Sequence, residues 1–270
     1  MSVHAEMTKI MTGADGFIAA LDQSGGSTPK ALKAYGITED QYEVGSESMY
    51  DMVHQMRSRI MTCPVFNGDR VIAAILFEAT MNREVEGKAT PKYLWEEKKI
   101  VPLLKCDKGL AAVENDCQLM KPIPGLDELL AHAKSLRVYG TKMRSVVKLA
   151  NPVGIKAIID QQFEVGKQII KAGLVPILEP EMDITSPEKA EAEDIIKAEI
   201  LAGLNKLGPD QHVMLKLSLP SKDNQYAELI AHPNCDRVVA LSGGYSLEES
   251  CDKLAKNNKM IASFSVSVKY

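Results

Sequence analysis

Lys216 lies in the middle of an apolar stretch, HVMLKLSLP (212–220), where a charged side chain needs an explanation. Met214, Leu215 and Leu217 predict a short buried strand around it. Apolar surroundings and nearby cations both favour the neutral form of a lysine amine. Such an amine attacks a carbonyl to form an imine, which draws electrons from the adjacent carbon so that a C–C bond one atom further along can break. The stretch therefore predicts an imine-forming lysine, with a buried ion pair or a snorkelling side chain as the purely structural alternative.

Carboxylates that could move protons in such a reaction occur in two other stretches. Glu179 and Glu181 stand in VPILEPEMD, and Asp22 stands in ALDQSGGS. Each could serve as an acid or a base. The cations that would favour a neutral amine and complement an anionic substrate are Lys105, Lys142 and Arg144. For any one of these residues alone, a simpler explanation is that the chain meets water at the end of a strand.

Two glycine pairs could hold the anionic part of a substrate. In LSGGYS (241–246), Gly243 and Gly244 free the backbone to direct N–H groups at an anion, just before the helical pattern of SLEESCDKLAK. DQSGGS (22–27) precedes the helical TPKALKAY and could do the same. A Gly-Gly pair by itself marks an ordinary turn, so each loop is only a candidate for binding phosphate.

Short runs rich in Val, Ile and Leu recur along the chain and predict about eight strands. Continuous apolar runs, in place of alternating ones, are typical of parallel strands covered by helices on their faces. The runs are GFIAAL (16–21), RVIAAILF (70–77), KIVPLLK (99–105), RSVVKL (144–149), LVPILE (174–179), HVMLKL (212–217), RVVAL (237–241) and MIASFS (260–265).

Helical patterns separate these runs. Residues 153–171 carry apolar side chains at helical spacing, and Gly173 is a stop signal just beyond them. A second helix is predicted over 187–207, with Ser186 as N-cap and Gly208 after its end. The alternation of strands and helices indicates an α/β fold.

A (β/α)8 barrel, the TIM barrel, is favoured over a doubly wound open sheet by the placement of polar residues. In such a barrel, catalytic residues come from the ends of many strands and meet at one mouth. Pairs with a spacing of two would point to one face of a strand, if the strand continues that far. They are Lys105 with Asp107, Lys142 with Arg144, and Glu179 with Glu181. We predict a single barrel domain over 1–270, apparently without its last helix.

These stretches together resemble class I fructose-bisphosphate aldolase of the bacterial kind. The resemblance covers residues 15 to 264, and each motif is modest while their ordered combination is specific. In chain order, the motifs are ALDQSGGST, KCDKG, TKMRSVVKL, VPILEPE, MLK and LSGG.

The resemblance implies a reaction and a role for each matching residue. Lys216 would form the Schiff base and Glu179 would be the main acid/base, while Glu181, Lys142 and Asp22 would assist. Lys105 and Arg144 would bind one phosphate end of the substrate. The other phosphate would contact Ser24, Ser27, Ser242, Gly243 and Gly244. The reaction would be reversible cleavage of fructose 1,6-bisphosphate to dihydroxyacetone phosphate and glyceraldehyde 3-phosphate, in glycolysis and gluconeogenesis, with no cofactor.

The sequence departs from the family pattern at two places. Gln23 stands where many relatives carry glutamate, a change expected to be mild. After the last strand the family usually continues with a phosphate-binding arginine and a final helix, whereas this chain reads SFSVSVKY, with Val266 where the arginine is expected. We expect the tail over 265–270 to be atypical, as in a truncation or a change of reading frame, with weaker phosphate binding and lower stability.

Composition narrows the class of partner. The net charge of -4 offers no basic field for nucleic acid and no cationic face for a membrane, so sugar phosphates or another copy of the chain are the expected partners. The five cysteines form no CxxC pair, and the start MSVHAEMTKI lacks signal-peptide features; both favour a cytoplasmic protein. The five histidines show no metal-ligand spacing, and HPNC (232–235) reads as a loop, so no metal is expected.

Two alternative functions stay open at this point. Another lysine-imine barrel enzyme, such as a transaldolase or a deoxyribose-phosphate aldolase, would share the chemistry but need fewer phosphate contacts. A non-catalytic chain that binds sugar phosphates or another subunit is the second alternative, because of the altered ending.

Overall fold

The computed structural model describes residues 2–24 and 27–265. Contacts between Cα atoms divide the chain into two compact units. The first comprises Met1–Lys105, His132–Tyr139 and Ser265–Tyr270, and the second comprises Cys106–Ala131 and Gly140–Phe264. The prediction of a single domain over the whole chain stays a prediction, and Val266 lies outside the described residues.

The first unit is built around three parallel strands, β1, β2 and β5, in that order. Ala19 lies opposite Ala74, and Ile75 lies opposite Leu103. Every residue of β2, VIAAIL, is buried, as its continuous apolar run predicts. The elements of this unit are α1 (Val3–Gly13), β1 (Phe17–Leu21), α2 (Ser27–Ala34), the 3-10 helix η1 (Glu39–Gln41), α3 (Glu47–Thr62), β2 (Val71–Leu76), α4 (Glu78–Met81), β3 (Glu84–Val85), β4 (Lys88–Ala89), α5 (Thr90–Glu96) and β5 (Val101–Lys105).

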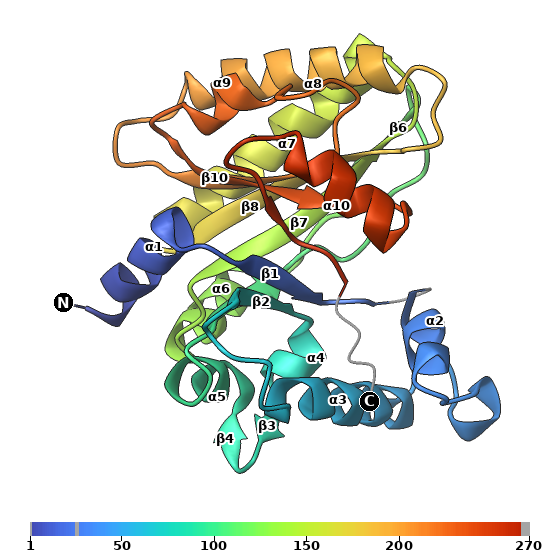
Figure 1. Ribbon diagram of the computed structural model, residues 1–270, viewed down its shortest axis with the longest axis vertical. Coiled ribbons are helices and arrows are strands. Elements are labelled where there is room, and N and C mark those ends of the chain that lie inside the picture. The colour runs from blue at the N-terminus through green and yellow to red at the C-terminus, as the bar shows by residue number, and fades with distance from the viewer. Residues whose placement is uncertain (1, 25–26, 266–270) are drawn as a thin grey trace. The chain divides into compact units, whose positions relative to one another are not determined.

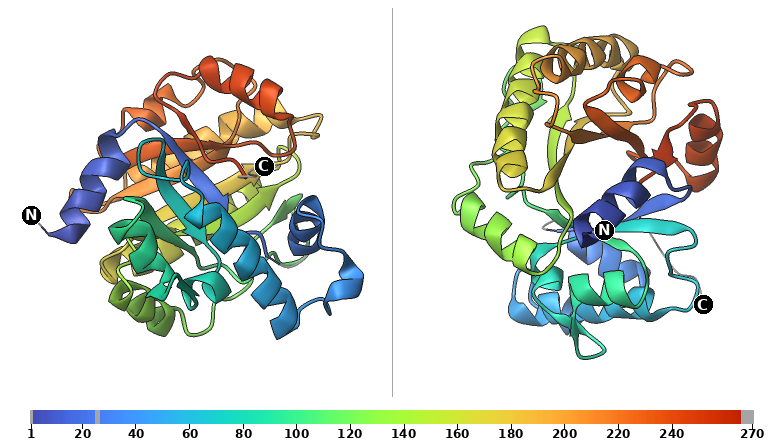
Figure 2. Two further views of the ribbon diagram at one scale, coloured as in Figure 1. Left: turned by 60° about the horizontal axis from the view of Figure 1, so that its bottom comes forward. Right: turned by 90° about the vertical axis from the view of Figure 1, so that its left-hand side faces the viewer.

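The second unit contains five parallel strands in the order β7, β8, β9, β10 and β11, with β6 antiparallel to β7. Helices α7 and α8 lie side by side next to these strands (Figures 1 and 2). The elements are β6 (Cys117–Gln118), α6 (Leu126–Ser135, whose last residues are counted with the first unit), β7 (Gly140–Val147), α7 (Pro152–Lys171), β8 (Val175–Met182), α8 (Lys189–Leu204), β9 (Val213–Ser218), α9 (Ala227–Ile230), β10 (Cys235–Leu241), α10 (Leu247–Ala255) and β11 (Ile261–Ala262).

Helix α7 begins and ends where its sequence predicts. The side chain of Asn151 accepts hydrogen bonds from the first free backbone N–H groups, and Pro152 occupies the first turn, where a missing N–H costs nothing. Gly173 follows the helix with a φ of 83°, the left-handed conformation that glycine adopts most readily. The predicted helix over 153–171 is therefore confirmed.

The predicted start of α8 is wrong. The helix begins at Lys189 with Glu188 as N-cap, and it ends at Leu204, so Ser186 is not its cap. Ser186 instead belongs to a turn, in which its backbone N–H donates to Asp183 O and its Oγ accepts from the Glu188 N–H. The Ser-Pro sequence is typical of both a helix start and a turn, and the preceding Asp183 determines the outcome here.

All eight predicted strands are present, with ends shifted by a few residues. The largest shift is in β7, which begins at Gly140 and so includes Lys142. Within the described residues, no helix combines the length and the apolar character needed to cross a membrane.

Candidate active site

Lys216 in β9 is buried and contacts a carboxylate. Its Nζ lies 2.9 Å from Oε1 of Glu179 in β8, and the two side chains are only 5% and 4% exposed. Oε2 of the same carboxylate lies 2.9 Å from Nζ of Lys142 in β7. Residues on three neighbouring strands therefore form one buried cluster, Lys142–Glu179–Lys216.

The cluster combines two amines with one carboxylate. We expected cations around Lys216; the structure places the carboxylate of Glu179 between Lys216 and Lys142. A buried group of two ammonium ions and one carboxylate carries an excess positive charge, whose desolvation is costly. The carboxylate thus lies within hydrogen-bond distance of both amines, as a group that exchanges protons with a lysine nucleophile must.

A second ion pair follows the cluster along the same strands. Arg144 lies two residues after Lys142 in β7, Glu181 lies two residues after Glu179 in β8, and Arg144 Nε donates to Glu181 Oε2. Burial acts to lower the pKa of Arg144, but the hydrogen bond and charge of Glu181 outweigh it and raise that pKa. The side chain of Arg144 is 37% exposed and thus accessible to an anion. The predicted pairs with a spacing of two do share one face in β7 and β8.

The loop after β10 has the backbone expected of an anion-binding turn. Gly243 and Gly244 are exposed and have φ values of 63° and 120°, which side chains rarely tolerate. A Cβ on Gly243 would lie 2.7 Å from Ile184 Cγ2. Ser242 accepts a backbone hydrogen bond from Tyr245, and Ser246 caps α10 by accepting from the Glu249 N–H. The two glycines are therefore exposed, in a left-handed backbone conformation, shortly before the start of α10.

The other predicted residues belong to the first unit. Asp22 is buried directly after β1, and Lys105 is the half-buried last residue of β5. Ser24 is half-buried and Ser27 begins α2. Because β5 ends at Lys105, the condition for Lys105 and Asp107 to share one strand face, a strand that continues to Asp107, is not met.

A buried arginine supports the segment after β1. Arg57 of α3 donates through Nη2 to the carbonyl of Gln23 at 2.6 Å and through Nη1 to Thr80 Oγ1 at 2.7 Å. Burial lowers the pKa of Arg57 to about 10, and the charge of Asp22 acts in the opposite direction. Gln23 Nε2 donates to Ala20 O and to Ser265 Oγ, so this amide has a structural role where relatives carry glutamate.

Comparison with known proteins decides the family. The family model "Glycolytic: Fructose-bisphosphate aldolase class-I" matches residues 3–224. A class 1 fructose-bisphosphate aldolase from Synechocystis sp. is 60% identical over 260 residues, covering 96% of this chain and 86% of that protein. The chain belongs to the class I fructose-bisphosphate aldolase family.

Solved structures confirm the predicted fold class. The fructose-bisphosphate aldolase of Plasmodium falciparum, solved with TRAP and a small-molecule inhibitor, superposes with a TM-score of 0.74 at 20% identity, covering 97% of this chain and 83% of that one. A protein of Corynebacterium glutamicum superposes with a TM-score of 0.57 at 10% identity, covering 98% and 85%. The chain thus has the parallel α/β barrel fold of the class I aldolases, and the family consists of lyases.

Asp107, to which the sequence assigned no role, contacts the backbone of the predicted site residue Arg144. Its Oδ2 accepts from the backbone N–H of Arg144, and its Oδ1 accepts from the N–H of Gly109. Asp107 is buried and so holds the loop after β5 against β7. Its spacing from Lys105 was visible in the sequence, but a contact with another strand's backbone leaves no such signal.

Ser218 is a second residue that the sequence did not single out. Its Oγ donates to Met182 O at 2.7 Å and accepts from Met182 N–H at 3.0 Å, which joins the ends of β8 and β9. The sequence signal for Ser218 was its position two residues after Lys216, which places both residues on the same face of β9.

The HPNC motif of this aldolase forms a turn. His232 Nδ1 accepts from the Asn234 N–H, and burial raises the pKa of Cys235 to about 12, so its thiol stays protonated. Across 2–24 and 27–265, no three His, Cys, Asp or Glu side chains are grouped so as to hold a metal ion.

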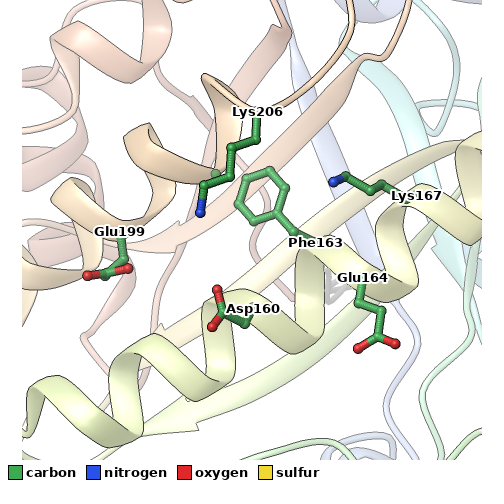
Figure 3. Close-up of a pocket in the computed structure, with 7 residues that line it drawn as sticks. Asp160, Phe163, Glu164, Lys167, Glu199 and Lys206 are labelled. Atoms are coloured by element: carbon green, nitrogen blue, oxygen red, sulfur yellow. The ribbon is translucent and has the colours of Figure 1, made fainter.

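A hollow of about 420 Å³ opens between α7 and α8, away from the strand ends (Figure 3). Helical and post-helical residues line it: Asp160, Phe163, Glu164, Lys167, Glu199, Gly203 and Lys206. Lys167 and Lys206 lie on either side of the Phe163 ring. The hollow includes none of the predicted site residues.

Proposed function

We propose that this chain cleaves fructose 1,6-bisphosphate reversibly to dihydroxyacetone phosphate and glyceraldehyde 3-phosphate through a Schiff base on Lys216. Membership of the class I aldolase family gives the reaction. The single observation that carries the assignment of residues is the buried Lys142–Glu179–Lys216 cluster, with 2.9 Å between each amine and the carboxylate.

The proposed chemistry uses the cluster in sequence. Neutral Lys216 Nζ attacks the ketone carbon of the open-chain sugar, and the resulting carbinolamine loses its hydroxyl as water after protonation, which gives a protonated imine. Glu179, in contact with the nucleophile, is the acid that delivers this proton. Lys142 holds the other oxygen of Glu179 and stabilises its carboxylate form after the transfer.

Cleavage of the C–C bond needs a base at the C4 hydroxyl. When that proton is removed, the C3–C4 electrons move toward the imine, the aldehyde leaves, and an enamine stays on Lys216. We assign the base to Glu179, with Glu181 and Asp22 assisting as the resemblance implies. Protonation of the enamine carbon and hydrolysis of the imine then release dihydroxyacetone phosphate and regenerate the amine.

Phosphate binding is assigned to the remaining predicted residues. Arg144 and Lys105 would bind one phosphate, and Arg144 would share its guanidinium between that phosphate and Glu181. The backbone N–H groups of the exposed residues Gly243 and Gly244, with Ser242, Ser24 and Ser27, would bind the other. We expect the enzyme to act in the cytoplasm on sugar phosphates, either alone or as a homo-oligomer.

Trapping the imine tests the proposal. Incubation with dihydroxyacetone phosphate and borohydride, followed by peptide mass mapping, should label Lys216, because reduction fixes the imine as a stable amine. Lys189 is the matched control, since it is also buried but its Nζ pairs with Glu193. Lys216→Arg should abolish labelling and turnover, since arginine stays protonated.

The control variant is Lys222→Arg at an exposed position, which should keep full activity. Labelling spread over many lysines, or no labelling, would defeat the proposed mechanism. Faster cleavage of a ketose monophosphate than of the bisphosphate would favour a transaldolase-like enzyme, and binding without turnover would favour the non-catalytic alternative.

A further inference from the structure

Gln162 of α7 is a fully buried amide that joins two strands of the site. Its Nε2 donates to Ser145 Oγ of β7 at 3.0 Å, and its Oε1 accepts from the backbone N–H of Glu179 in β8 at 3.0 Å. Its side chain has no exposure. A helix side chain thus contacts the peptide group of the proposed acid/base residue itself.

The Glu179 N–H donates to this helix side chain at the end of the pairing between β8 and β9. Glu179 lies between Pro176 and Pro180, neither of which has an N–H to donate. The register of β8 with β9 covers Ile177–Met214 and Leu178–Leu215, so Glu179 follows directly after these pairs. A buried N–H without a partner costs free energy, and Gln162 supplies the partner.

The inner face of α7 is otherwise apolar. Ile155, Ile158 and Ile159 precede Gln162 on this face and Ile169 follows it, all fully or almost fully buried. An apolar side chain would therefore satisfy packing at position 162. Gln162 is the polar residue among these buried isoleucines, and it differs from them in making hydrogen bonds to Ser145 and Glu179.

A glycine one turn later brings α7 close to β8. A Cβ on Gly166 would lie 3.3 Å from Leu178 Cδ2, which is closer than most such contacts. The short distance lets a glutamine of ordinary length reach the backbone of β8. Helix α7 and Glu179 are thereby fixed relative to each other.

We propose that Gln162 is a positioning residue for the aldol reaction, which holds the Glu179 carboxylate between Lys142 and Lys216 by fixing the Glu179 peptide group to β7. The inference rests on the proposed role of Glu179 as acid/base. The two amines that Glu179 contacts are on different strands, so a small shift of its backbone lengthens at least one contact. Displacement of a catalytic group by about 1 Å can cost roughly a hundredfold in rate.

The test compares Gln162→Met with Gln161→Met. Gln161 is the neighbouring residue on the same helix, and its amide also makes two hydrogen bonds, accepting from Met120 N–H at 2.9 Å and donating to Met120 O at 3.0 Å. Both variants lose two hydrogen bonds through the same change, so both should lower the midpoint of thermal unfolding. Only Gln162→Met should lower kcat, by about 10- to 100-fold, with KM changed less than about twofold.

A double variant separates positioning from general damage. If Gln162 acts through Glu179, then Gln162→Met added to Glu179→Gln should lower kcat no further, because the group it positions is already gone. Multiplication of the two losses would overturn the proposal, as would equal kcat for Gln162→Met and Gln161→Met. Should Gln162→Met fail to fold, Gln162→Glu replaces it in the same comparison: its protonated acid can make both contacts, so kcat relative to the unsubstituted chain should rise as pH falls. If the kcat of Gln162→Glu relative to the unsubstituted chain does not change with pH, the proposal is overturned.

Borohydride trapping keeps the two hypotheses distinct. Lys216 labelling in the unsubstituted chain, with no kcat difference between the two methionine variants, overturns the role of Gln162 alone. Absence of Lys216 labelling in the unsubstituted chain overturns the proposed function and the role of Gln162 with it.

Discussion

At the scale of single residues, Glu179 is the centre of the site because one carboxylate contacts two amines. Glu179→Gln keeps the size of the side chain but cannot accept a proton. We expect kcat to fall by roughly a hundred- to ten-thousand-fold, the usual contribution of a positioned proton-transfer group. Steady-state kinetics checks this, and Glu164→Gln, an exposed position on α7, is the control. An unchanged kcat with a raised KM would assign Glu179 to substrate binding instead.

His54 gives a prediction about pH and stability. Burial lowers its pKa below 6.5 and Arg83 acts in the same direction, while the hydrogen bond between Nε2 and Glu84 O opposes the shift. Below pH 6.5 the unfolded chain binds a proton at this residue more readily than the folded chain, so stability falls as pH falls through this window. Urea unfolding between about pH 5 and 8 should show the decline, and His54→Gln should reduce it.

The control for this prediction is His132→Gln, at an exposed position on α6. This variant should lose as much stability as the unsubstituted chain when the pH falls. If His54→Gln and the unsubstituted chain lose the same stability between these pH values, then His54 is not the group responsible.

The sequence predicted some site residues and not others for physical reasons. Lys216 stood out because a charge inside an apolar strand is costly, and Glu179 stood out through its spacing from Glu181. Gln162 gave no signal, because a glutamine in a helix usually faces solvent. Its contacts are with Ser145 of β7 and the backbone of Glu179 in β8, strands that lie before and after it in the chain.

At the scale of elements, the close packing of α7 against β6 depends on Gly154. A Cβ at this position would lie 2.2 Å from Asn115 O and 2.8 Å from Cys117 Sγ, so the helix could not approach β6 as it does. Gly154→Ala should therefore destabilise the protein by about 1–3 kcal/mol, as overpacking does. Thermal unfolding measures the change.

Gly13→Ala provides the matched control for the helix substitution. Gly13 ends α1 and has open space around its Cα, so alanine there should be neutral or stabilise the chain. A stability loss at Gly13 equal to that at Gly154 would show that close packing on β6 is not the cause.

Element prediction succeeded where local signals agreed. The strands are continuous apolar runs, and α7 covers the predicted residues and is followed by Gly173, the expected stop signal. The start of α8 was mispredicted because Ser186 is used in a turn with Asp183. That choice depends on the structure before the helix, which a capping rule does not consider.

At the scale of the whole molecule, the proposed chemistry depends on amines and carboxylates of the chain itself. We expect EDTA to leave the cleavage rate and the unfolding midpoint unchanged, since the described part of the chain offers no group of three metal ligands. A zinc-dependent enzyme assayed in parallel shows that chelation is effective. Loss of activity in EDTA that added zinc restores would contradict the lysine-imine mechanism.

The fold class was predictable because two independent patterns agreed. Eight apolar runs separated by helical segments indicated parallel strands, and polar residues near their carboxyl ends favoured a barrel over an open sheet. The expected effect of the ending on phosphate binding and stability stays a prediction, since Val266 lies outside the described residues.

The prolines of β8 have a further consequence, for the newly made chain. Parallel strands pair with segments distant in sequence, so they wait longer for their partners than hairpin strands do. An unpaired strand with a full row of N–H donors can add to another molecule and start aggregation. Pro176 and Pro180 remove two donors from β8, which weakens any intermolecular ladder. We therefore expect these two prolines to favour a high yield of soluble chain during synthesis.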